Sequence, residues 1–402
     1  MLPMKFLGHT RYSLFIPSSG AWKASNGSRF DTPESYKEYL YSDSRMDLRE
    51  RIFLGASIPA LAKAADGFEL RHIVSYSESL PDKRKDALRR AAEKYPFLVL
   101  EELPDGVQPK DRVETVGDYL TKGTLFGEYR LDDDDILSKD YFERMGEYIK
   151  DDLVGYVVSF PLGIEAILAD GKAMNLREMH YPMYGLGLLY VCKKLSDGTI
   201  RRPSSSSHTK VDRHNPTILD ARKLSYVRFN HSTQDNSMSA TADADLSRIA
   251  AGMEKYPQLR DNFNLEENFP TIADWVVDGA DIDLVGQITG DGAKLPSAMR
   301  GFKITVDAEF PDSAIPNQYL LSFELAGPDG SALPLGKPGV GLGASVDPKV
   351  GYFRYLNSQP GRRVLKEFVF LPDGVAAGRV RLVKWRNDDD VTVHSAKISR
   401  LL

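Results

Sequence analysis

Several features that would assign a chain quickly to a class are missing from this sequence. It has a single cysteine, Cys192, in 402 residues, which excludes an intrachain disulfide framework and any zinc site built from cysteines. No apolar run of about 18 residues occurs, and the N-terminal stretch MLPMKFLGHTRYS lacks the apolar core of a secretion signal. We therefore expect a cytoplasmic protein with no transmembrane segment.

An excess of positive charge is missing as well. The 52 lysines and arginines are outnumbered by 57 aspartates and glutamates, which gives a formal net charge of −5. A chain whose main partner is nucleic acid normally carries a basic surface, so we expect no nucleic-acid partner. The length, with a hydrophobic content of 42%, is sufficient for two domains that each bury a core.

The most unusual stretch is a run of four aspartates, residues 132–135, in the sequence YRLDDDDILSKDYFE. Before the run, apolar and polar residues alternate as in a strand. After it, the apolar residues of KDYFERMGEYI recur at helical spacing. The run therefore lies at the carboxyl end of a predicted strand, where open α/β sheets bind their ligands.

Close carboxylates repel one another by roughly 4 kcal/mol per pair at an effective dielectric constant of about 20, so such a run must face water or bind a cation. In extended backbone, Asp132 and Asp134 would point to one side of the chain. Two hard oxygen ligands on one side suit Mg²⁺ or Mn²⁺ held jointly with a phosphate-bearing substrate. A solvated acidic turn is the alternative, and we favour it for the later aspartates at 388–390.

Strands and helices alternate over the first part of the chain. Strands are predicted for residues 5–16, 68–76 and 97–103, with helices between them, of which the second covers residues 81–95. Pro59 should end or kink the first of these helices. This order predicts an α/β fold with a mostly parallel sheet and right-handed crossovers, which the aspartate strand would extend.

The pattern changes twice after the aspartate strand. Residues 175–236 look irregular and include the serine run 204–207, which predicts either disorder or a mobile lid. After residue 279, alternating apolar residues and turn signals recur without helices, which predicts an all-β antiparallel sandwich. We therefore expect a catalytic α/β domain over residues 1–278 and an accessory β-sandwich domain over residues 279–402.

The segments HTRYS, RERIFLGASIPALAKAADGFELRHIVSYSESLP and RLDDDDILSKDYFER resemble a bacterial family described as putative rhamnosyltransferases. More broadly, LDDDDILSKDYFE resembles the acidic signature of nucleotide-sugar glycosyltransferases with the GT-A fold. The resemblance covers roughly residues 5–240 and implies a GT-A, Rossmann-like domain. It also implies a metal-dependent hexosyltransferase, with Mn²⁺ or Mg²⁺ as cofactor. Such an enzyme moves a sugar, with rhamnose as one option, from a nucleoside-diphosphate donor to a glycan, glycoconjugate or other hydroxyl acceptor.

The resemblance implies roles for individual residues. Asp134 would ligate the metal, Asp132 would contact the donor ribose or the metal shell, and Asp135 would orient the site. His231, on a predicted strand, is the candidate for a further metal contact, and His208 is the second candidate. The remaining residues predicted to bind the donor are Arg11, Ser13, Tyr76, Arg130 and Asp133.

If the reaction inverts the anomeric configuration, a carboxylate must take the proton of the acceptor hydroxyl. Glu178 is the first candidate, because the aromatic residues of REMHYPMYG could stack on a sugar, and Asp212 is another. A retaining reaction would need no such base. The other acidic candidates in this region are Glu165 and Asp170.

Two other classes stay open. A non-catalytic carbohydrate-binding protein could hold Ca²⁺ at the aspartates, although calcium loops usually space their ligands and include a glycine. A glycoside hydrolase would need two carboxylates flanking the sugar bond and no metal. The β-sandwich could bind the glycan, mediate formation of a homo-oligomer, or only support the catalytic domain.

Overall fold

The computed structural model describes residues 4–17, 30–204, 207–231, 233, 242–277, 281–338 and 340–402. The chain forms two compact units, each assembled from several segments. The first comprises Met1–Ala166, Leu176–Phe229 and Tyr256–Trp275, and the second comprises Ile167–Asn175, Asn230–Lys255 and Val276–Leu402. Within the described ranges, no helix is long and apolar enough to cross a membrane. The cytoplasmic location stays a prediction.

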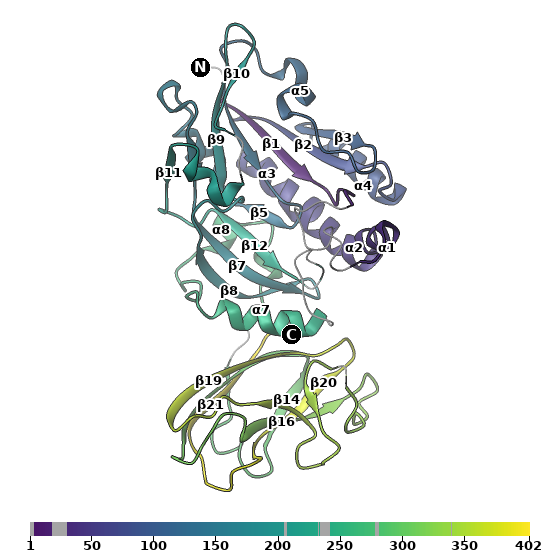
Figure 1. The fold of residues 1–402 in the computed structure, drawn as a ribbon, viewed down its shortest axis with the longest axis vertical. Coiled ribbons are helices and arrows are strands. Elements are labelled where there is room, and N and C mark those ends of the chain that lie inside the picture. Colours follow the sequence, from purple (N-terminus) through teal and green to yellow (C-terminus); the bar gives the residue numbers. More distant parts are fainter. Residues whose placement is uncertain are drawn as a thin grey trace. The chain divides into compact units, whose positions relative to one another are not determined.

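The first unit is built on an eight-stranded sheet (Figure 1). In the order in which they lie side by side, its strands are β11 (Thr217–Leu219), β6 (Val157–Ser159), β9 (Leu188–Lys194), β4 (Leu125–Arg130), β1 (Lys5–Arg11), β2 (Glu69–Ser77) and β3 (Leu98–Leu103), with β10 (Ile200–Arg201) paired to β9. β1 to β4 are parallel, whereas β9 runs antiparallel to β4 and β6. The predicted mostly parallel sheet is confirmed.

Successive residues of β1 point to opposite faces of this sheet. Phe6 lies in the larger apolar cluster of the unit, and Leu7 lies in a smaller cluster on the other face. The smaller cluster contains Cys192, which is buried as predicted, and valines of α5 (Arg112–Val116). The helices that contribute to the larger cluster are α2 (Asp43–Ile52), α3 (Ile58–Ala64), α4 (Asp82–Lys94) and α6 (Tyr141–Gly146).

The helix predicted before Pro59 does not end there. α2 continues into a π-helical turn, Phe53–Ser57, and then directly into α3. Proline has no N–H to donate to the carbonyl four residues earlier, which is why a break was expected. The wider π turn, in which the N–H of Ile58 reaches the Phe53 carbonyl, accommodates the proline without interrupting the helix.

Gly8, in the middle of β1, is required by the side chains beside it. A Cβ atom at Gly8 would lie 2.2 Å from His72 Nδ1 and 2.4 Å from the Tyr129 ring, and these two side chains are hydrogen-bonded at 2.9 Å. We expect Gly8→Ala to lower the free energy of unfolding by about 1–3 kcal/mol, because the bonded pair would have to move. Urea unfolding measures this change.

Gly252, in α7 (Ala242–Met253), provides the control for that substitution. A Cβ atom at Gly252 would meet nothing within 4 Å, so alanine there should stabilise the helix by about 0.5–1 kcal/mol. If Gly8→Ala and Gly252→Ala had the same stability, the packing around β1 would be wrong.

The sequence pattern of residues 175–236 looks irregular, but the described part of the segment contains several strands, and the strand predicted for SYVRFNHS is confirmed. The segment supplies strands to the eight-stranded sheet and to a second sheet. Because these strands are short and separated by turns, no period of two accumulates in the sequence. Residues 205 and 206 of the serine run lie outside the described residues. In order, the second sheet consists of β5 (Asp135–Leu137), β12 (Tyr226–Asn230), β7 (Leu162–Ala169) and β8 (Lys172–His180).

The second unit contains the predicted antiparallel β-sandwich. One sheet has the order β13 (Asp281–Asp283), β21 (Thr392–Arg400), β15 (Gly301–Phe310) and β19 (Gly361–Phe370). The other has the order β14 (Ala293–Met299), β20 (Ala376–Lys384), β16 (Tyr319–Ala326), β18 (Tyr352–Tyr355) and β17 (Gly343–Ala344). The alternating apolar residues of β15 face the core as predicted: Phe302, Ile304, Val306, Ala308 and Phe310.

This second unit also includes two segments that precede residue 279. Phe368 and Phe370 of β19 share an apolar cluster with side chains from both segments. The boundary between residues 278 and 279, and a homo-oligomer formed through the sandwich, stay predictions. The other members of the cluster are Ile167, Met174, Leu246, Ala250, Met253 and Leu401.

Candidate functional site

The aspartate run connects β4 of the first sheet to β5 of the second. Its backbone is not extended, because the N–H of Asp135 donates to the carbonyl of Asp132 at 3.3 Å and closes a turn. Asp133 and Asp135 are buried, with 3% and 4% of their surface exposed. The side chains of Asp132 and Asp134 are 46% and 13% exposed. The turn therefore exposes Asp132, leaves Asp134 only partly accessible, and uses Asp133 and Asp135 for internal contacts.

Asp133 is held by the end of β1 and by α2. Its Oδ1 forms an ion pair with Arg49, and its Oδ2 accepts hydrogen bonds from the N–H and the hydroxyl of Ser13 at 3.2 and 3.4 Å. Arg49 Nη2 also lies 3.3 Å from Asp134 Oδ2. Arg45, one helical turn earlier, donates to the Ser13 hydroxyl at 2.9 Å. One face of α2 thus fixes the aspartate turn against β1.

Ser13 adopts a backbone conformation that is unusual for a residue with a side chain. Its φ angle is +44°, in the left-handed region, which costs roughly 1 kcal/mol or more. Its contacts with Asp133 and Arg45 maintain this conformation, which directs its N–H at the Asp133 carboxylate. Strained residues of this kind occur preferentially at functional sites.

The Leu131 carbonyl, directly before the turn, is positioned by a second buried network. The hydroxyl of Thr10 donates to it at 2.7 Å and lies 2.9 Å from His72 Nε2. Burial lowers the pKa of His72 to about 3, so this ring is neutral at physiological pH. The network links β1, β2 and β4 just below the aspartates.

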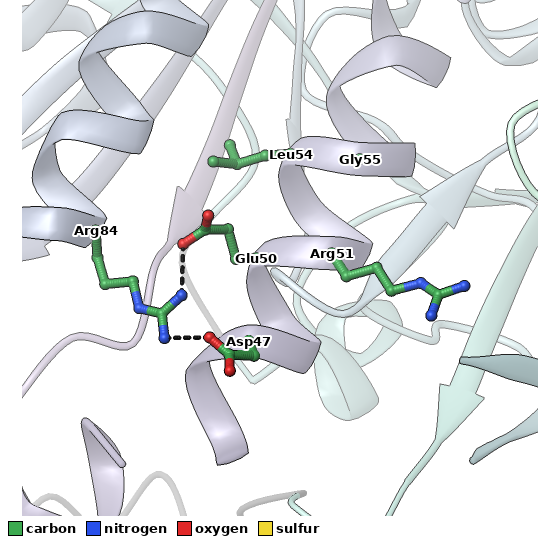
Figure 2. Close-up of a pocket in the computed structure, with 6 residues that line it drawn as sticks. All are labelled: Asp47, Glu50, Arg51, Leu54, Gly55 and Arg84. Carbon is green, nitrogen blue, oxygen red and sulfur yellow. Dashed lines mark hydrogen bonds and ion pairs between the residues drawn. The ribbon is translucent and has the colours of Figure 1, made fainter. Parts of the chain in front are cut away.

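The opposite face of α2 lines a surface pocket of about 400 Å³ (Figure 2). Figure 2 shows the guanidinium of Arg84, from α4, against Glu50 and Asp47, with Nη1 2.9 Å from Glu50 Oε2. Arg51 points away from them and lies 4.8 Å from the centroid of the Trp275 ring. Because the acidic groups of this pocket are paired with a buried arginine, we interpret it as a structural contact between helices.

Two arginines lie on the β1 side of the exposed aspartates. Nη2 of Arg130 lies 2.7 and 2.9 Å from the two carboxylate oxygens of Asp132. Burial and the nearby Arg130 lower the pKa of Arg11 to about 10, although Asp132 and Asp133 act in the opposite direction. The two guanidinium groups repel each other, and the carboxylates of Asp132 and Asp133 offset part of this repulsion.

A third arginine, Arg228, lies on the other side, opposite Asp135 in the antiparallel pair of β12 and β5. Its Nη1 donates to Glu165 at 2.7 Å, and its guanidinium lies 5.8 Å from the centroid of the Tyr184 ring. Burial would lower the pKa of Arg228, but Tyr184, Glu165 and Asp135 raise it, so the side chain remains charged. Burial and the neighbouring aspartates raise the pKa of Asp135 well above its usual range.

The two predicted histidines lie in different surroundings. The His208 ring lies edge-on to Tyr184, with centroids 6.1 Å apart, and its Nδ1 donates to the Met183 carbonyl at 3.0 Å. This tautomer leaves the lone pair of Nε2 available as an acceptor or ligand. His231 belongs to the second unit, is 1% exposed, and has its Nδ1 3.0 Å from the hydroxyl of Thr233.

Residues 5–243, more than half of the chain, match a protein family described as "Putative rhamnosyl transferase". The chain belongs to this family. It is a glycosyltransferase, and it has the α/β unit with a mostly parallel sheet and the antiparallel sandwich that the sequence predicts. No curated protein matches the chain.

Several solved structures are similar to this glycosyltransferase at low identity. The inositol-1-phosphate CTP transferase from T. maritima is 12% identical with a TM-score of 0.27, and the match covers 63% of this chain and 96% of that one. S. aureus TarS 1–349 in complex with UDP-GlcNAc is 12% identical with a TM-score of 0.28, covering 64% and 68%. S. aureus TarS is 10% identical with a TM-score of 0.27, covering 94% and 77%. At this level of similarity, no activity transfers from these proteins to this chain.

In this glycosyltransferase, most of the residues predicted to bind donor or metal come together at the ends of β1 and β4. They are Arg11, Ser13, Arg130, Asp132, Asp133 and Asp134. Tyr76 instead lies in the core at 3% exposure, with its hydroxyl 3.3 Å from Glu102 Oε2. Its role as a donor contact stays a prediction.

The two predicted catalytic carboxylates differ in their surroundings. Glu178 accepts from the N–H and Nε of Arg260 at 3.0 and 2.6 Å, and hydrogen bonds from Arg260 lower its pKa. Asp212 is exposed on the 3₁₀ helix His208–Arg213, and among the described residues its carboxylate has no hydrogen-bond or ion-pair partner. Glu178 is thus engaged by Arg260, whereas the Asp212 carboxylate faces solvent.

Sequence reasoning did not find Arg49, Arg228 or Tyr184. Two arginines at positions i and i+4 of a predicted helix, beside the buried Met46, were the available signal for Arg49. Arg228 lies between the apolar residues Val227 and Phe229 of β12, which was the signal for a buried charge. Neither signal by itself indicates that the arginine lies beside the aspartate run.

Proposed function

We propose that this glycosyltransferase moves a sugar from a nucleoside-diphosphate donor to a hydroxyl of a glycan or glycoconjugate, with the help of Mn²⁺ or Mg²⁺. The observation that supports this most directly is the turn after β4, which presents Asp132 and Asp134 next to three arginines. Carboxylates alone would favour a cation and arginines alone an anion. Together they suit a complex of a metal ion with a diphosphate. The description of the family makes rhamnose the first sugar to test.

The residues at this edge fit a divalent cation that is shared with the donor. Asp132 and Asp134 offer hard oxygen ligands of the kind that Mg²⁺ and Mn²⁺ prefer. Over the described ranges, no group of three or more His, Cys, Asp or Glu side chains could hold a metal ion. Diphosphate oxygens and water would therefore complete the coordination. The two predicted histidine ligands, His231 and then His208, stay predictions, because either would have to move to join Asp132 and Asp134.

When bound, the metal ion neutralises negative charge on the departing nucleoside diphosphate. Arg11, Arg130 and Arg228 would bind the phosphate oxygens. Arg130 is paired with Asp132 in this structure. It would become available for a phosphate if Asp132 bound the cation instead. Arg49 and Ser13 have a positioning role, because they hold the turn that carries Asp134.

A screen of nucleotide sugars tests this function. The full chain is incubated with dTDP-, UDP- and GDP-linked sugars, dTDP-rhamnose first, and the release of nucleoside diphosphate is measured with Mn²⁺ and with EDTA. We expect release from one donor class, at least a tenfold loss in EDTA, and recovery when Mn²⁺ is added back. If EDTA did not affect the release, the proposed metal dependence would be wrong. If no donor released nucleoside diphosphate, the proposed transferase function would be contradicted.

For an inverting reaction, we expect Asp212→Asn to lower kcat by about a hundredfold or more, because a positioned general base contributes roughly 10²–10⁴-fold. Glu178→Gln should instead lower stability, by less than about 1 kcal/mol, because it weakens a partly exposed ion pair. Steady-state kinetics and urea unfolding of both variants measure these changes. A larger loss of kcat in Glu178→Gln than in Asp212→Asn would return the role to Glu178.

A further inference from the structure

A second place in the first unit has the properties of a ligand site and takes no part in the proposed donor binding. It is a groove of about 630 Å³, which is within the usual range of roughly 300–1,000 Å³ for ligand pockets. It lies at the first residues of β2 and just before β3, the end of the parallel strands opposite the aspartate turn. The lining of this aromatic groove includes Phe68, Tyr95, Phe97 and Tyr119.

The rings of the aromatic groove are held in place before any ligand binds. Phe68 lies edge-on against Phe6 of the core, with centroids 5.6 Å apart. The rings of Tyr95 and Phe97 are 5.9 Å apart and inclined by 47°. Phe68, Tyr95 and Phe97 are only half-buried, so part of each ring is accessible. A fixed apolar surface of this kind loses little side-chain freedom on binding.

Two polar groups in the aromatic groove are unengaged. Within the part of the chain that the structure describes, the Asp66 carboxylate and the Tyr95 hydroxyl make no hydrogen bond or ion pair. The carboxylates in the pocket of Figure 2 differ, because Asp47 and Glu50 are both paired with Arg84. The aromatic groove therefore combines apolar surface with a few free polar groups, as ligand sites do.

The charges around the aromatic groove argue against a phosphate-bearing ligand. Among the described residues that line it, the only cation is Arg71. Arg71 lies over the Tyr119 ring at 5.3 Å and donates to the Pro96 carbonyl at 3.4 Å. Glu69 is neutralised by Lys5, with Nζ 2.8 Å from Oε2. Lys94 does not line the groove, although its Nζ lies 5.2 Å from the centroid of the Tyr95 ring. Among the described lining residues a phosphate would find only the engaged Arg71, whereas a neutral ligand has no charge to satisfy.

We propose that the aromatic groove binds a neutral segment of the acceptor glycan. One face of a sugar ring carries C–H groups that stack on aromatic rings, and its hydroxyls donate to carboxylates and bond to phenols. Phe97 and Tyr95 supply the rings, and Asp66 and the Tyr95 hydroxyl supply the polar contacts. This inference rests on the proposed function, because a transferase that extends glycans gains from retaining a long acceptor between transfer steps.

Affinity electrophoresis of the full chain tests this, without donor or metal, in gels that contain a dissolved rhamnan, mannan or β-glucan. We expect at least one of these neutral polysaccharides to retard the protein. Phe97→Ala should abolish the retardation, and Asp66→Asn should weaken the affinity about fivefold, as the loss of one hydrogen bond does. Phe97→Leu keeps apolar volume but removes the ring, and it decides the question if the alanine variant does not fold.

Two further variants make the outcome specific. Tyr355→Ala removes an aromatic residue of the second unit that is 38% exposed, and it should be retarded like the wild type. Asp134→Asn should also be retarded like the wild type, so a failure of the donor-site assignment can be told apart from a failure of the aromatic groove. No retardation by any of the three polysaccharides would overturn the proposal. Retardation that survives Phe97→Leu, or that Tyr355→Ala abolishes, would overturn it as well.

Discussion

Asp134→Asn should lower kcat/KM for glycosyl transfer by about a thousandfold while leaving the fold intact. Asparagine has the size of aspartate but lacks the negative charge that a divalent cation needs. A loss of roughly 4 kcal/mol of transition-state stabilisation corresponds to about a thousandfold in rate. Asp134 lies in a turn, and Arg49 keeps its buried ion pair with Asp133 in this variant, so far-UV circular dichroism should be unchanged. The transfer rate with the donor found in the screen is the measurement.

The chain offers a matched control in its other aspartate run. Asp388 is exposed in the loop between β20 and β21, and Asp388→Asn should transfer sugar at the wild-type rate. Asp132→Asn should resemble Asp134→Asn, because both carboxylates are proposed to bind the same cation. Full activity of Asp134→Asn would refute the metal-ligand assignment.

Arg49→Ala should lower the free energy of unfolding by about 3–5 kcal/mol, which is the usual loss when one partner of a buried ion pair is removed. Arg49 and Asp133 are 6% and 4% exposed at their side chains, so the substitution would leave a buried carboxylate without its ion-pair partner. The turn would then move, and transfer activity would fall as well. Urea unfolding followed by circular dichroism measures the stability.

Arg51, two residues along the same helix, gives the comparison. Arg51 lies over the Trp275 ring, and such a contact contributes about 0.5–1 kcal/mol, so Arg51→Ala should have a small effect. The double variant Arg49→Ala, Asp133→Asn should recover part of the stability, because the amide is cheaper to bury than a carboxylate. If Arg51→Ala were as destabilising as Arg49→Ala, the ion pair with Asp133 would not be the cause.

The layered architecture could be predicted because it depends on local patterns. In β1, Phe6 and Leu7 alternate between two apolar clusters, and the same alternation in β15 identified the sandwich. Prediction failed where local signals are ambiguous. Pro59 normally interrupts a helix, and only the π turn before it shows how the helix continues.

The candidate site was predictable only in part. The four aspartates are adjacent in the sequence, so their charge repulsion is visible without a structure. Arg49 reaches Asp133 across 84 residues, and Arg260 reaches Glu178 across 82. An arginine on a helix is normally solvated, and an acidic residue beside aromatic residues suggests a sugar site. Only the fold shows that the helical arginine pairs with Asp133 and that Glu178 pairs with Arg260.

The apolar cluster on β19 limits how this protein can be recombined with its relatives. A chimera that exchanged only the residues after 278 would leave Phe368 and Phe370 against a foreign helix and a foreign hairpin tip. A functional graft of the sandwich should therefore carry residues 167–175 and 230–255 with it. Substitutions in α7 and in β19 should accordingly co-vary among relatives, although more than a hundred residues separate the two elements in the chain.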